Sequence, residues 1–287
     1  MLLIGFVLAS CSPMKMIDTL VPDDGYNSET GIAYGPEKRQ KLDVYRPERP
    51  DPAKPVILFF YGGSWKSGER GNYRFVGQSF AAEGFTVVVP DYRLYPEVTF
   101  PSFVEDGAAA VAWTAENLDR TAGGNGGIVL IGHSAGAHIA ALLTLDARYL
   151  TRAGVSPDVI DGIVGLAGPY AFDPLRYRST KPIFESAEDL EVTRPITFVR
   201  AGAPPALLLH GLEDRTVWPL HSEELAARLA EAGNQASYIP LDGVGHVEIL
   251  LALAEPFTYL APVRPSIMSF IEKTGRQEAA TLTKSSP

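Results

Sequence analysis

The stretch that decides the fold is Ile128-Val-Leu-Ile-Gly132-His-Ser134-Ala-Gly136, followed at once by the alanine-rich residues 137–147. Its continuous apolar run predicts a strand with both faces buried, because a half-exposed strand would alternate with polar residues. Residues 137–147 have helical spacing and composition. Glycine at 132 and 136 allows a tight turn between the two elements, where a Cβ would clash with neighbouring backbone. Ser134 is then presented at the amino end of the helix.

On both sides of this stretch, short apolar runs alternate with helical patterns. Strands are predicted at residues 56–60, 86–89, 128–132, 160–166, 206–210 and 237–241, and helices at 103–118, 135–147, 220–232 and 257–273. Such alternation implies parallel βαβ units. Residues 31–34 and 41–45 are expected to form an antiparallel hairpin at the sheet edge. The predicted fold class is α/β, with a mostly parallel central sheet of about eight strands and helices on both faces.

One folded domain accounts for most of the 287 residues. Residues 1–30 are interpreted as an apolar amino-terminal segment and linker, 31–274 as the domain, and 275–287 as a flexible tail. Within the domain, residues 168–205 lack periodicity and contain six prolines, which break regular elements. We therefore expect an irregular insertion there, near the carboxyl edge of the sheet.

Composition excludes several classes of protein. Apolar residues make up 46% and charged residues 21%, an ordinary globular balance. The net charge of -9 would repel a phosphate backbone, so no nucleic-acid partner is expected. The single cysteine, Cys11, allows neither an intrachain disulfide nor a cysteine-based metal cluster. No metal and no organic cofactor is predicted.

The amino-terminal residues leave the location of the protein open. Residues 1–10 are apolar, uncharged and too short to span a bilayer as a helix. Leu8-Ala9-Ser10-Cys11 resembles the lipobox of bacterial lipoproteins, which implies lipidation of Cys11 and a place in the bacterial cell envelope. No basic residue precedes Lys15, whereas a signal peptide begins with a basic region. The alternative is an apolar tail on a cytoplasmic protein, and the sequence favours neither.

Ser134 lies in Gly-x-Ser-x-Gly between a buried strand and a helix, the context of the nucleophile elbow of α/β-hydrolases. A serine hydroxyl is a weak nucleophile, so a histidine must accept its proton and an acid must orient that histidine. In α/β-hydrolases both follow the serine, the acid first. Of five histidines only His246 comes late enough, on a loop after the strand at 237–241. Asp214 resembles the family's acid in Gly-x-x-Asp-x-x-Val and is favoured over Glu213.

A second glycine motif follows the strand at 56–60. Tyr61-Gly62-Gly63-Ser64-Trp65 resembles the His-Gly-Gly motif of lipases and esterases. That resemblance implies an oxyanion hole formed by the N–H groups of Gly62, Gly63 and Ala135. Tyr61 takes the place of the usual histidine, and we expect its phenol to hold the loop by hydrogen bonds in the same way.

A third motif, Asp91-Tyr-Arg-Leu94-Tyr-Pro96-Glu97, is similar to Asp-Tyr-Arg-Leu-Ala-Pro-Glu of hormone-sensitive-lipase-like esterases. In that family it is mainly scaffolding, so Asp91 and Arg93 are expected to make structural hydrogen bonds. Together the motifs resemble hormone-sensitive-lipase-like and BD-FAE-like esterases of the α/β-hydrolase fold, over about residues 55–250.

Aromatic residues in loops at the carboxyl edge of the sheet suggest the substrate, because ligands of such folds bind there. They are Tyr61, Trp65, Tyr95, Tyr170, Phe172 and Trp218. The leading hypothesis is a serine carboxylesterase for small to medium, apolar or aromatic esters, working through an acyl-enzyme. One alternative is an arylformamidase resembling kynurenine formamidase, whose motif is close to residues 132–138. Another is a catalytically silent ligand-binding protein on the same fold. The oligomeric state stays open.

Overall fold

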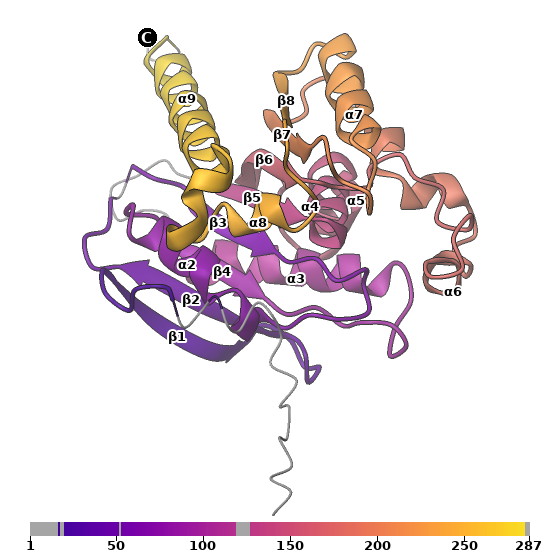
Figure 1. Cartoon of the computed structure of the whole chain (residues 1–287), viewed down its shortest axis with the longest axis horizontal. Helices are drawn as coiled ribbons and strands as arrows, with labels where there is room; N and C mark the ends of the chain where they lie inside the picture. Colours follow the sequence, from indigo (N-terminus) through magenta and orange to yellow (C-terminus); the bar gives the residue numbers. More distant parts are fainter. Residues whose placement is uncertain (1–16, 18–19, 52, 119–126, 285–287) are drawn as a thin grey trace, which may run out of the picture.

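The computed structural model describes residue 17 and residues 20–51, 53–118 and 127–284, with the backbone alone for 275–284 (Figure 1). The lipobox-like segment and Cys11 lie outside these residues. Among the helices of the described part, none combines the length and the apolar character needed to cross a bilayer.

An eight-stranded sheet forms the centre of the molecule, in the order β1-β2-β4-β3-β5-β6-β7-β8. The strands are β1 (Tyr26–Ala33), β2 (Lys41–Pro47), β3 (Val56–Phe60), β4 (Val87–Pro90), β5 (Ile128–His133), β6 (Ile160–Leu166), β7 (Ala206–Gly211) and β8 (Ala236–Leu241). Strand β2 is antiparallel to both of its neighbours, and the pairs from β4 to β8 are parallel. Every residue of β3, β4 and β5 is buried, as their continuous apolar runs predict.

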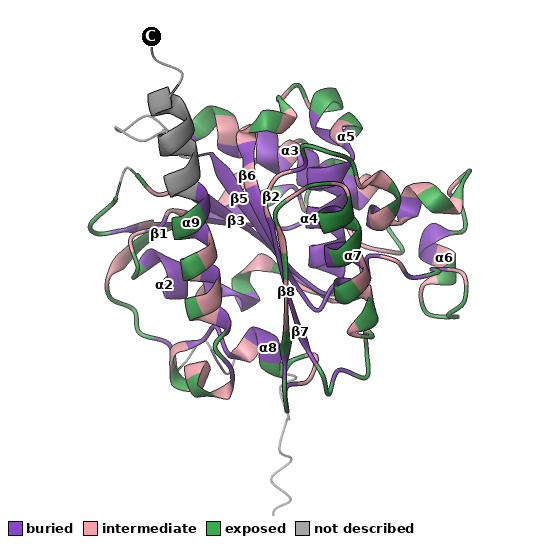
Figure 2. Ribbon diagram, turned by 90° about the horizontal axis from the view of Figure 1, so that it is seen from above, coloured by how far each residue is buried: buried purple, intermediate pink, exposed green. Residues whose placement is uncertain are grey.

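Helices cover both faces of this sheet. Helices α2 (Arg74–Ala81) and α9 (Val263–Lys284) lie on one side, and α3 (Ser102–Asn117), α4 (Ala135–Leu145), α5 (Ala147–Arg152) and α7 (Leu220–Glu231) on the other (Figure 2). The remaining helical elements are short: α6 (Lys181–Phe184), α8 (Glu248–Leu251), η1 (Arg70–Asn72), η2 (Pro157–Val159), η3 (Leu190–Thr193), η4 (Pro195–Phe198) and η5 (Glu255–Leu260). Parallel strands all end at one edge of the sheet, so the loops that follow them meet there.

Several elements differ from the sequence prediction. Strand β1 begins at Tyr26, inside the expected linker, because this edge strand is largely exposed and lacks an apolar signal. Helix α2 was not predicted, since polar residues such as Ser79 interrupt its buried face. The helix expected at 257–273 is divided, because Ala261 is extended between η5 and α9. Helix α9 continues to Lys284, so the expected tail begins as helix.

The insertion at 168–205 contains no strand and only the short elements α6, η3 and η4. It is fastened to helix α4 through His138, whose side chain is fully buried. The imidazole Nε2 of His138 lies 2.7 Å from the carbonyl oxygen of Thr193 and donates to it. Three rings enclose His138, those of Trp65, Phe172 and Phe184. Burial lowers the pKa of His138 to about 4, so the ring is neutral at neutral pH.

This buried imidazole makes stability depend on pH. In the unfolded chain His138 titrates near its ordinary pKa of about 6.5, so below that pH the unfolded state binds more protons than the folded state. Stability is therefore lost as pH falls, by about 2 kcal/mol from His138 between pH 7 and pH 5. In His138→Gln, we expect the loss of unfolding free energy over this interval to be smaller by that amount. Urea unfolding at the two pH values measures it, and an unchanged pH dependence would contradict the interpretation.

Candidate active site

The turn between β5 and α4 is built by close backbone contact. A Cβ at Gly136 would overlap the carbonyl oxygen of Phe60, and one at Gly132 would overlap the carbonyl of Gly136. Ser134 has φ 55° and ψ -121°, a backbone conformation that residues other than glycine rarely adopt. Its N–H donates to the carbonyl oxygen of Leu166 over 2.9 Å, which fixes the turn against β6. The Ser134 side chain therefore points away from the sheet edge.

Three predicted residues from separate loops form one hydrogen-bonded chain. The hydroxyl of Ser134 lies 2.9 Å from Nε2 of His246, and Nδ1 of His246 lies 2.6 Å from Oδ2 of Asp214. With a proton on Nδ1, His246 donates to the carboxylate and accepts from the serine hydroxyl. The His246 side chain is 13% exposed and that of Asp214 is 0% exposed. The geometry of a nucleophile, a base and an orienting acid is thus present.

Asp214 is held as a carboxylate. Burial opposes its ionisation, but hydrogen bonds with His210, His246 and the Val217 amide outweigh burial and lower its pKa. Its Oδ1 accepts from the amides of Thr216 and Val217 at 2.8 and 2.9 Å. Glu213, the other acid considered from the sequence, is exposed.

Two further histidines lie against this chain. Nε2 of His133 donates to the carbonyl oxygen of His246 over 2.9 Å, so the residue before the serine supports the loop that carries the base. Burial, together with nearby His246, lowers the pKa of His133 to about 3. His210 lies 3.2 Å from Oδ2 of Asp214 through its Nε2. The sequence analysis gave neither residue a role beside His246 or Asp214.

The glycine loop after β3 lies directly beside Ser134. A Cβ at Gly62 would be 3.0 Å from the Cβ of Ser134, and Gly63 has φ 120°. Ser64 and Trp65 also have positive φ, so the loop turns sharply. No described residue accepts a hydrogen bond from the amides of Gly62, Gly63 or Ala135. These three N–H groups remain available to a ligand next to the serine.

Tyr61 is fully buried beneath this loop and does not line the cavity that opens at Ser134, so the predicted pocket role was wrong. Its hydroxyl donates to Oδ1 of Asp91 over 2.6 Å and accepts from Arg39 over 2.9 Å. Its ring is stacked between Tyr73 and Tyr92, at centroid distances of 5.0 and 4.8 Å. The phenol thus ties the glycine loop to the Asp91 segment.

Asp91 and Arg93 make the structural contacts expected of their motif. Asp91 accepts from the backbone N–H of Arg70 over 2.7 Å and forms an ion pair with the same arginine. The Arg93 guanidinium pairs with Asp106 at 2.7 Å. Among the described residues, neither Asp91 nor Asp106 forms a hydrogen bond with Ser134 or His246.

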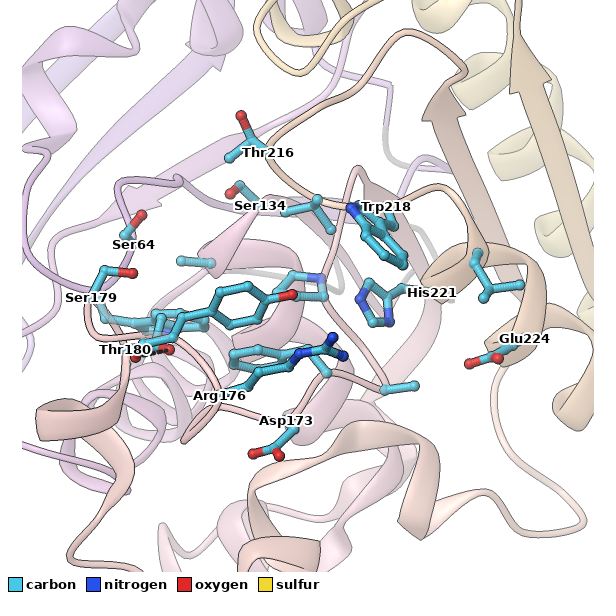
Figure 3. A pocket seen from close by; sticks show the side chains of 18 residues that line it. Ser64, Ser134, Asp173, Arg176, Ser179, Thr180, Thr216, Trp218, His221 and Glu224 are labelled. Carbon is cyan, nitrogen blue, oxygen red and sulfur yellow. Dashed lines mark hydrogen bonds between the residues drawn. The ribbon is translucent and has the colours of Figure 1, made fainter.

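A cavity of about 420 Å³ opens at Ser134 (Figure 3). Of the predicted aromatics, Trp65, Phe172 and Trp218 line it. Tyr95 and Tyr170 do not, because loop spacing does not fix side-chain direction. The insertion supplies much of the wall, and the lining residues from it are Pro169, Ala171, Phe172, Asp173, Arg176, Tyr177, Ser179 and Thr180.

The mouth of the cavity carries exposed apolar side chains. Trp218 is 60% exposed, Leu220 49% and Tyr177 46%. Figure 3 shows Trp218 beside Ser134, with His221 next to it. Burial lowers the pKa of His221 to about 4, so this wall carries no imidazolium charge at neutral pH. In the described residues, no group of three or more His, Cys, Asp or Glu side chains is placed to hold a metal ion.

Comparison with known proteins identifies several relatives. Esterase LipC of Mycobacterium tuberculosis is 30% identical over 268 residues, covering 86% of this chain and 66% of LipC. A probable isoprenylcysteine alpha-carbonyl methylesterase of Oryza sativa is 30% identical, over 77% of this chain and 58% of its own length. Kynurenine formamidase of Danio rerio is 26% identical, over 78% and 76%. The chain thus spans less than two thirds of the first two relatives.

Solved structures and a family model complete the comparison. Esterase B from Lactobacillus rhamnosis superimposes with a TM-score of 0.79 at 18% identity, over 94% of this chain and 93% of that protein. The predicted α/β-hydrolase fold is confirmed, with its mostly parallel eight-stranded sheet. The family model BD-FAE matches residues 42–229, about two thirds of the 287 residues, and this chain belongs to the BD-FAE family.

Proposed function

We propose that this protein is a serine hydrolase that cleaves small to medium, apolar or aromatic carboxylic esters. The observation that carries the proposal is the unbroken chain of hydrogen bonds from Ser134 through His246 to Asp214, at the edge of a cavity. Membership of a family with esterase relatives supports the same reaction class. A silent binding protein would have no need to keep this geometry.

The reaction follows from the atoms in place. Ser134 Oγ attacks the ester carbonyl carbon while its proton passes to Nε2 of His246. Negative charge moves to the carbonyl oxygen, where the free amides of Gly62, Gly63 and Ala135 would stabilise it. The tetrahedral intermediate collapses, its C–O bond to the alcohol breaks, and His246 returns the proton to that alcohol. Water then attacks the acyl-enzyme with His246 as base, which releases the acid and restores Ser134.

The cavity supports a substrate of modest size. A volume of about 420 Å³ is near the lower end for small-molecule sites, and aromatic rings of Trp65, Phe172 and Trp218 line it. The exposed apolar mouth at Trp218 and Leu220 would contact whichever ester group extends outside. An aryl formamide presents the same carbonyl chemistry, and the similarity to kynurenine formamidase keeps that reaction as the second candidate.

A fluorophosphonate probe tests the nucleophile. We expect the wild type to be labelled covalently, because its Ser134 hydroxyl is activated by His246, and Ser134→Ala to remain unlabelled. The same substitution should lower kcat/KM for nitrophenyl butyrate at least about a thousandfold. Ser179→Ala is the matched control, since Ser179 also lines the cavity and should label like wild type. Label that persists in Ser134→Ala would assign the nucleophile elsewhere.

A substrate series tests the reaction class. We expect kcat/KM to be highest for nitrophenyl acetate or butyrate and to fall for the decanoate, since the proposed substrates are small to medium esters. An aryl formamide assayed alongside should be the poorer substrate. If the formamide gives the highest kcat/KM, the protein is a formamidase with the same three catalytic residues.

The Tyr61→Phe variant tests the anchor beneath the glycine loop. It removes the hydroxyl that donates to buried Asp91 while keeping the stacked ring. We expect the unfolding free energy to fall by about 1.5 to 3 kcal/mol, and kcat to fall with little change in KM, because the loop amides act on the transition state. Tyr73→Phe is the control, since Tyr73 stacks on the same ring. Equal effects in both variants would contradict a specific role of the Tyr61 hydroxyl.

A further inference from the structure

The carboxylate of Asp214 accepts four hydrogen bonds, which fill both of its oxygens. Oδ1 accepts from the amides of Thr216 and Val217. Oδ2 is shared by two imidazoles, His246 Nδ1 at 2.6 Å and His210 Nε2 at 3.2 Å. The catalytic acid proposed above therefore has a second histidine on the same oxygen as the base.

The surroundings of His210 determine which of its nitrogens carries the proton. Nε2 faces two acceptors, Asp214 Oδ2 and the carbonyl oxygen of Val217 at 3.0 Å, so Nε2 must be the donor. Nδ1 lies 2.7 Å from the hydroxyl of Ser222, on helix α7, which donates to it. The side chain of His210 is 0% exposed, so no water is needed to complete this arrangement. A neutral imidazole with its proton on Nε2 satisfies every partner.

We propose that His210 is a positioning residue for the catalytic acid. Its Nε2–H donates to Oδ2 of Asp214, the oxygen that also accepts from His246, and so shares the charge of that oxygen. The proposal rests on the esterase function, because it assigns a role in orienting His246. His210 does not contact the substrate cavity, so it acts only through Asp214.

The charge that His246 experiences depends on this hydrogen bond. When His210 donates to Oδ2, less of the carboxylate charge is directed at His246, so the imidazolium formed during catalysis is stabilised less. The exposed carboxylate of Glu248 lies at the start of α8, two residues after His246. Two other histidines lie near, His133 from β5 and, beyond His210, His221 from α7. Burial lowers the pKa of both, to about 3 and about 4, so both stay neutral where His246 must act. Loss of the His210 donor should therefore raise the pH at which activity appears.

Two variants of similar size separate hydrogen bonding from packing. His210→Gln keeps an N–H donor within reach of Asp214, whereas His210→Met fills similar volume without one. In His210→Met we expect kcat for nitrophenyl butyrate to fall on the order of 10- to 100-fold with little change in KM, because Oδ2 of Asp214 loses one of the two donors that orient it. The acidic limb of the pH profile of kcat/KM should move to higher pH by about 0.5 to 1 unit. In His210→Gln most of kcat and the wild-type limb should return.

The outcomes are distinct. Equal losses in both variants with an unmoved acidic limb would reduce His210 to a packing residue and overturn the proposal. Two-dimensional ¹H–¹⁵N spectra of the imidazoles give a readout independent of activity, and a wild-type His210 protonated on Nδ1 would overturn it as well. If the wild type neither turns over esters nor reacts with the fluorophosphonate, the esterase function fails, while the spectra still report whether His210 donates to Asp214.

Discussion

The candidate active site depends on the close approach of the first turn of helix α4 to the ends of strands β3 and β5. Gly136 is in contact with the carbonyl of Phe60, and Gly132 with the carbonyl of Gly136, so no side chain fits at either position. This contact places Ser134 in a conformation with positive φ, next to the glycine loop that follows β3. Ser134 and the free amides of that loop are thus brought together by close backbone contacts, before any side chain contributes.

Much of the fold could be predicted because its central strands carry a strong signal. Strands 56–60 and 160–166 have the predicted bounds, since both are continuous apolar runs buried in the sheet. Strand β1 was placed too late, because an exposed edge strand needs no apolar residues. Helix α2 was missed, because a buried polar residue such as Ser79 finds its partner, the carbonyl of Leu253, far along the chain.

The candidate site, like the fold, could be predicted from the sequence only in part. Chain order and loop position were enough to select Ser134, Asp214 and His246, and the structure joins them by hydrogen bonds. Side-chain direction was not encoded in spacing, so Tyr61 proved to lie beneath the loop instead of in the cavity. His210 was overlooked because its partners are an acid in a turn and a serine on helix α7, and only the folded chain brings all three together.

The stacked tyrosine beneath the glycine loop has a consequence for how acidity acts on the protein. A histidine in that place would change its charge near pH 6 to 7. Burial, and then the nearby Tyr92 and Asp91, raise the pKa of Tyr61 well above its ordinary value, so the phenol keeps its proton throughout that range. The hydrogen bonds that Tyr61 makes beneath the glycine loop are therefore insensitive to pH near neutrality, whereas those of a histidine at this position would change as its charge changed.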